Sequence, residues 1–109
     1  MININIVRDK ECFVQEFTVK GHADSVRSGR DIVCAAVSAI TYTALGALDE
    51  LTGIRHYTEE YGYIRCNMPL DVFGDNKYRA QIILDAMVIG FKQVELQYKK
   101  YVSVMDEEV

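Results

Sequence analysis

The chain has 109 residues, half of them apolar, and carries a formal net charge of −4 at pH 7. This length predicts a single domain over residues 1–109, with a core large enough to be stable without disulfide bonds or a structural metal. The negative net charge argues against direct binding to nucleic acid and favours a basic protein partner. Charges interrupt the apolar runs before the roughly 18 residues of a membrane helix, and no basic segment precedes an apolar core at the N-terminus. Three cysteines without a C-x-x-C pair predict thiols rather than a disulfide framework. We therefore expect a cytoplasmic protein that does not bind membranes.

The first half of the chain predicts a hairpin followed by a helix. Residues 2–6 alternate Ile and Asn, which is the period of a strand with one buried face. After a polar turn at 8–11, Phe13, Phe17 and Val19 share one parity within 12–20. Residues 21–30 hold few apolar side chains and are expected to form a mobile surface loop. Asp31 is expected to cap a helix that ends near Gly53. Its stripe at helical spacing is Val33, Val37, Ile40, Ala44, Leu45 and Leu48.

The second half predicts another hairpin, another helix and a last strand. Residues 54–59 and 63–68 flank a short connection that contains a glycine. Asp75 or Asn76 is expected to cap the second helix, and residues 101–105 alternate before a solvated acidic end. The order β-β-α-β-β-α-β predicts an α+β fold, with an antiparallel or mixed sheet of about five strands and two helices. The stripe of the second helix is wide enough to predict burial on more than one side: Ile82, Ile83, Ala86, Met87, Ile89, Phe91 and Val94.

His22 and Cys34 are the candidates for catalysis, because a thiol and an imidazole suffice for nucleophilic chemistry when they meet. With Asp31 as the N-cap, Cys34 falls in the first helical turn, where unpaired N–H groups and the helix dipole favour a thiolate and lower its pKa from about 8.5. Ser38 lies one turn further on, where its hydroxyl can bond to the sulfur, the imidazole or a substrate carbonyl.

Other interpretations of these residues stay open. Cysteine is among the residue types most often buried, and the apolar residues 35–37 beside Cys34 also suit a core. Ser38 also suits a small residue that lets a helix approach a sheet. A domain without catalytic activity that binds protein partners is therefore the alternative function.

The sequence spacing of the candidate ligands and glycines gives little support to a metal site or a phosphate site. Neither Gly21 nor Gly29 belongs to a known phosphate-binding pattern, and no cofactor is predicted. The other histidine and the other two cysteines, His56, Cys12 and Cys66, lie on predicted strands and are expected to be structural. The four possible zinc ligands lack the short paired spacing of metal motifs; they are His22, Cys34, His56 and Cys66.

Residues 21–38 resemble the signature of the ribosomal-processing cysteine protease family of bacteria. That signature is GHA, a spacer of five residues, a glycine, one further residue and DIVCAAVS. Here GHA is residues 21–23, the glycine is Gly29 and DIVCAAVS is residues 31–38. The remainder of the chain resembles the family more loosely.

The resemblance implies an endopeptidase that removes a short N-terminal extension from large ribosomal subunit protein twenty-seven, built as a small α+β homodimer. It implies His22 as general base and Cys34 as nucleophile, with Asp31 and Ser38 in supporting roles, and no metal or cofactor. The loop that closes over the substrate contains Gly21, Ala23 and Gly29.

The chain departs from the family pattern inside this loop. Many members carry a glycine after GHA and an aromatic residue before the loop glycine, where this chain has Asp24 and Ser28. We therefore expect a different cleavage sequence. A third member of the catalytic site is not evident, and Asp31 is the candidate by its place in the motif.

Overall fold

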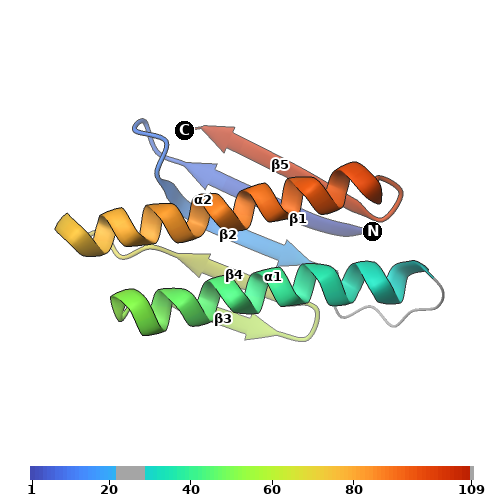
Figure 1. Ribbon diagram of the computed structural model, residues 1–109, viewed down its shortest axis with the longest axis horizontal. Helices are drawn as coiled ribbons and strands as arrows, with labels where there is room; N and C mark the ends of the chain where they lie inside the picture. Colours follow the sequence, from blue (N-terminus) through green and yellow to red (C-terminus); the bar gives the residue numbers. More distant parts are fainter. Residues whose placement is uncertain (22–28, 109) are drawn as a thin grey trace.

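The computed structural model describes residues 1–21 and 29–108 (Figure 1). The predicted element order and the α+β class are confirmed. The elements are β1 (Ile2–Arg8), β2 (Val14–Lys20), α1 (Gly29–Thr52), β3 (Tyr57–Glu60), β4 (Tyr63–Asn67), α2 (Gly74–Gln97) and β5 (Val102–Glu108).

The strands form one mixed sheet in the order β3-β4-β2-β1-β5. Both predicted hairpins are antiparallel, and β2 pairs antiparallel with β4. The last strand pairs parallel with the first, with Ile2 opposite Val102. Both helices lie on the same face of the sheet, α1 over the β3–β4 side and α2 over the β1–β2 side (Figure 1). The fold therefore has two layers, and no described element covers the second face of the sheet.

The core lies between the sheet and the helices. Ile2, Ile4 and Ile6 are buried while Asn3 and Asn5 are exposed, as the alternation predicted. The predicted stripe of α1 is confirmed, with only Ile40 half-buried. α1 ends where Gly53 adopts φ +76, and the N–H of Gly53 donates to the Asp49 carbonyl at 2.9 Å.

Several predicted element boundaries were wrong. α1 begins at Gly29, two residues before Asp31, so Asp31 lies in the first turn and is not the cap. β2 begins at Val14, which leaves Cys12 in the turn with φ +67, and β3 begins only at Tyr57. α2 follows Phe73 as N-cap, and no side chain caps it. At α2, packing against the sheet rather than a capping side chain sets the start of the helix.

α2 is buried on one side only, contrary to the prediction from its wide stripe. Its buried residues face the sheet, whereas Ile82 is 52% and Ile89 is 58% exposed. The reason is the two-layer architecture, because none of the elements in residues 1–21 and 29–108 covers the outer side of the helices. An apolar surface therefore remains on that side.

One expectation about apolar runs was also wrong. No charged residue lies between Ile32 and Leu48. Within the described residues, the helical segment Ile32–Thr52 is long and apolar enough, by length and composition, to cross a membrane. In this fold the same segment supplies Val33 and Val37 to the core against the sheet.

A charged cluster joins the end of β1 to β5 and α2. Nε of Arg8 donates to Oδ1 of Asp106, and Nη1 donates to Oδ1 of Asp85, both at 2.9 Å. Nη1 also donates to the carbonyl of Cys12 at 2.8 Å, and Nζ of Lys92 donates to Oδ2 of Asp106 at 2.9 Å. The acidic end of the chain is thus paired in part, where the sequence predicted a solvated end.

Candidate active site

Cys34 is the sixth residue of α1, half-buried and packed against the core cluster. The helix has 24 residues and starts at Gly29, so Cys34 lies in the second turn rather than in the predicted first turn. The unpaired N–H groups of a helix belong to its first four residues, and the dipole effect falls off within the first turn. Activation of this thiol by the helix start is therefore weaker than the sequence suggested.

Cys34, Ser38 and Tyr42 follow one another at intervals of one turn on the flank of α1 that faces away from α2. Successive residues are rotated by about 100° around a helix, which places this flank nearly opposite the one that carries Ile40 and Ala44. The hydroxyl of Tyr42 donates to Oε2 of Glu59 on β3, which shows that this flank meets the edge of the sheet. Ser38 is half-buried there, one turn after Cys34 as predicted.

Gly21 ends the strand that leads to the predicted general base. Its N–H donates to the Gly62 carbonyl at 2.7 Å, in the turn of the β3–β4 hairpin. Its φ is +94, and a Cβ at this position would lie 2.8 Å from the carbonyl oxygen of Met1. Only glycine fits this close approach, so the residue before His22 is held between the hairpin and the N-terminus.

The structure describes some of the other predicted site residues but not all of them. His22 and Ala23 lie outside the described residues, so the approach of His22 to Cys34 stays a prediction. Gly29 is the first residue of α1 and Asp31 the third. Of the loop predicted over 21–30, residues 22–28 lie outside the described residues, and the last two residues belong to the helix.

The remaining thiols and the second histidine have structural surroundings. Cys66 is 1% exposed, and burial, with a smaller contribution from the charge of Glu16, raises the pKa of its thiol to about 12. Nδ1 of His56 lies 2.8 Å from the carbonyl oxygen of Asn67. Among residues 1–21 and 29–108, no group of three or more His, Cys, Asp or Glu side chains is arranged to hold a metal ion.

Sequence reasoning missed the contact between Tyr42 and Glu59. The hydrogen bond to Glu59 and partial burial raise the pKa of Tyr42 to about 12. Helical spacing from Cys34 was a usable signal for Tyr42. No local pattern points to Glu59, because its position beside α1 arises from the packing of the sheet edge.

Comparisons with known proteins identify the family of this chain. A family model described as cysteine protease Prp matches residues 1–103. This chain belongs to the Prp family. It is therefore a cysteine protease, as the resemblance implied. The Bacillus subtilis protein named ribosomal processing cysteine protease Prp is 28% identical over 107 residues, covering 95% of this chain and 96% of the relative. A Staphylococcus aureus protein of that name is 30% identical, covering 95% and 97%.

Solved Prp structures share the fold. The S. aureus ribosomal processing protease Prp in complex with a substrate peptide has a TM-score of 0.85 and 26% identity, covering 98% of this chain and 100% of the other. The same protease with a covalently linked product peptide has a TM-score of 0.83 and 28% identity over the same shares.

Proposed function

We propose that this Prp protein is a cytoplasmic endopeptidase that removes the N-terminal extension of large ribosomal subunit protein twenty-seven during ribosome maturation. The observation that carries the proposal is the match to Prp over residues 1–103, with relatives named ribosomal processing proteases. The net charge of −4 supports it, since an acidic enzyme attracts a basic ribosomal segment.

The proposed mechanism uses Cys34 as nucleophile and His22 as general base. Sγ attacks the scissile carbonyl and forms a thioester, while the thiol proton passes through His22 to the leaving amine. Water then attacks the thioester, giving the carboxylate and restoring the thiol. A solved relative with a covalently linked product peptide supports a covalent route.

Supporting roles are proposed for the neighbours of the pair. Ser38 lies one turn from Cys34 on the same flank, so its hydroxyl is placed to bond to a substrate carbonyl or to the imidazole. Asp31 is the candidate third member of the site. The chain from Gly21 through Ala23 to Gly29 closes over the peptide, and no metal or cofactor takes part.

The test uses the extended ribosomal protein from the same organism. The wild type should release one N-terminal fragment, identified by mass spectrometry, and Cys34→Ala and His22→Ala should release none. Cys12→Ala is the matched control, because it removes an exposed thiol in the turn between β1 and β2. Undiminished cleavage by Cys34→Ala contradicts the mechanism, and tight binding without cleavage by the wild type favours a binding domain.

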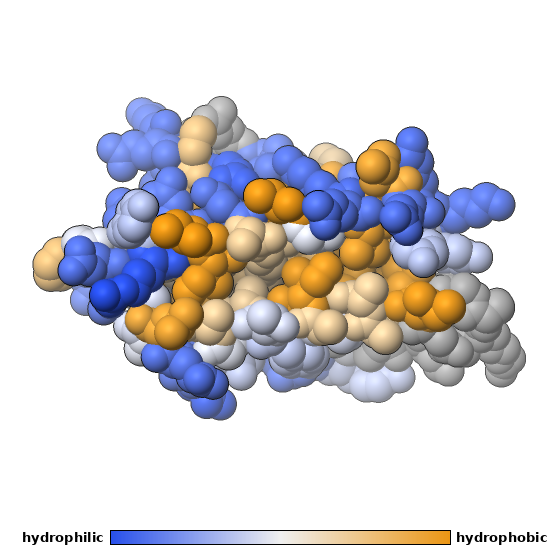
Figure 2. Space-filling model, in the orientation of Figure 1, coloured by the Kyte–Doolittle hydropathy of each residue, from blue (hydrophilic) through white to orange (hydrophobic). Residues whose placement is uncertain are grey.

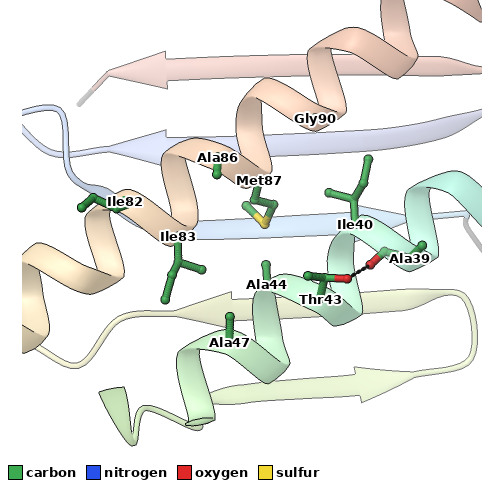
Figure 3. A pocket seen from close by; sticks show the side chains of 10 residues that line it. All are labelled: Ala39, Ile40, Thr43, Ala44, Ala47, Ile82, Ile83, Ala86, Met87 and Gly90. Carbon is green, nitrogen blue, oxygen red and sulfur yellow. Dashed lines mark hydrogen bonds between the residues drawn. The ribbon is translucent and has the colours of Figure 1, made fainter. Parts of the chain in front are cut away.

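We also propose that the protein is a homodimer through the outer side of its helix layer. An apolar groove of about 470 Å³ lies between α1 and α2 (Figure 3). Small residues open it, among them Ala47 and Ala86, and a Cβ added at Gly90 would lie 3.3 Å from Cδ1 of Ile40. Figure 2 shows apolar side chains gathered along this side.

The size of this side suits a second copy. The molecule extends 44 × 24 × 18 Å, and Figure 1 looks down the shortest axis onto the helices. The face in view measures about 1,000 Å², against about 800 Å² per partner in a standard interface. The groove opens on the flank of α1 opposite Cys34, so dimer formation leaves the thiol accessible.

Sedimentation velocity at micromolar concentration tests the dimer. The wild type should sediment as a dimer, and Ala86→Arg should sediment as a monomer with an unchanged circular dichroism spectrum. Leu70→Arg is the matched control, because Leu70 is 98% exposed in the connection before α2. A monomeric wild type, or an Ala86→Arg protein that stays dimeric, contradicts this interface.

A further inference from the structure

β3 is an edge strand with unused main-chain groups. Among the described residues it pairs with β4 only and stands at the end of the sheet. The N–H of Asn67 donates to the carbonyl of His56 at 3.2 Å, and hydrogen-bonded pairs alternate along an antiparallel ladder. Thr58 therefore bonds to β4, as does Glu60. The N–H and C=O groups of Tyr57 and Glu59 point to the open edge.

This edge runs beside the flank of α1 that carries Cys34. The Tyr42 hydroxyl bonds to Glu59, which fixes the strand against the helix. Tyr42 follows Cys34 by eight residues, a distance of about 12 Å along the axis. At its far end the hairpin reaches the end of β2, where Gly21 donates to Gly62. The open edge thus lies against the same flank of α1 that carries Cys34, two turns further along the helix.

We propose that the open edge of β3 is the docking strand for the peptide substrate. The peptide binds in extended form, exchanges main-chain hydrogen bonds with Tyr57 and Glu59, and continues to Cys34. An extended chain advances about 3.3 Å per residue, so 12 Å places the contact with β3 three to four residues from the scissile bond. This inference rests on the proposed function and names the surface that function uses.

Charge complementarity identifies the side chain that this edge prefers. Glu59 and Glu60 are exposed, and in the described part of the chain no ion pair neutralises either of them. An extended peptide with a cationic residue three to four positions from the scissile bond meets both the main-chain groups and this charge. The opposite edge, β5, lies beyond β1 at the other side of the sheet and does not meet this flank of α1.

The first experiment alters the peptide and leaves the enzyme intact. Synthetic peptides spanning the cleavage site of the extended ribosomal protein carry a single N-methyl group at each position in turn. In an extended peptide, every second N–H group faces β3. Methylation of either of two such N–H groups should therefore lower kcat/KM about five- to tenfold, while methylation of the residue between them should leave kcat/KM unchanged. N-methylation without effect throughout this segment overturns the docking strand.

The second experiment alters the strand. Glu59→Ala removes the carboxylate and keeps the N–H, whereas Glu59→Pro removes both, so the proline variant should raise KM beyond the alanine variant. Glu60→Gln should lower kcat/KM about two- to fivefold for a peptide that carries the cationic residue. It should leave kcat/KM unchanged for the same peptide with norleucine at that position. Glu107→Gln, on the opposite edge, is the matched control. Equal losses for both peptides overturn the charge preference.

Binding to Cys34→Ala separates this inference from the proposed reaction. If the wild type does not cleave the unmodified peptide, the proposed function fails. The affinity of Cys34→Ala for each N-methylated peptide still tests whether the peptide binds along β3. Alternating affinities support the edge. Affinities that do not depend on the methylated position overturn it.

Discussion

Replacing Gly21 by alanine tests whether the strand end before His22 is held as the structure indicates. The left-handed conformation at φ +94 costs an alanine about 1–2 kcal/mol. The added Cβ would lie 2.8 Å from the Met1 carbonyl oxygen, and overpacking of this kind costs about 1–3 kcal/mol more. The sum of about 2–5 kcal/mol should lower the melting temperature by about 8–20 °C.

The same change should slow catalysis. To reach an ordinary contact the backbone must move by about half an ångström, and a misplacement of about 1 Å costs roughly a hundredfold in rate. We expect kcat/KM on a fluorogenic peptide to fall about tenfold, at a temperature where the variant remains folded.

Gly53→Ala is the matched control for this prediction. Gly53 has a similar φ of +76, but a Cβ there meets no atom within 4 Å, and the residue ends α1 far along the chain from Cys34. This variant should lose about 1–2 kcal/mol and keep its activity. Wild-type stability and activity in Gly21→Ala, or an equal loss of activity in Gly53→Ala, would refute the reasoning.

Two further predictions concern charge and thiols. Partial burial opposes ionisation of Asp106, but hydrogen bonds from Arg8 and Lys92 outweigh it and hold its pKa below 3.8. The stabilisation is therefore present above pH 3.8 and is lost as the pH falls through the depressed value. Asp106→Asn should lower the melting temperature at pH 7 by about 4–8 °C, and in thermal scans the gap to the wild type should close in acid; a gap independent of pH contradicts this pairing. The Cys66 thiol, with its pKa near 12, should resist iodoacetamide at pH 8 until the protein unfolds, as measured by mass spectrometry; rapid labelling of the native protein contradicts its burial.

Local patterns explain why most of the fold was predictable. The alternation of Ile and Asn in β1 and the stripe of α1 each report which face meets a core, because the side-chain period of a strand or helix is fixed by backbone geometry. Helix starts were predicted less well. α1 begins at Gly29, before Asp31, and α2 begins at Gly74 without a side-chain cap. At α2, packing of a long helix on the sheet outweighs the roughly 1 kcal/mol of one cap.

The sequence by itself determined the order of elements, the buried faces and, through residues 21–38, the family. Each of these depends on neighbours along the chain. The tertiary structure decided the parallel pairing of β5 with β1, the bare outer side of α2 and the position of Cys34 in the second turn. It also brought Glu59 to Tyr42. These features arise from contacts between segments distant in sequence, and no local periodicity records which surfaces meet.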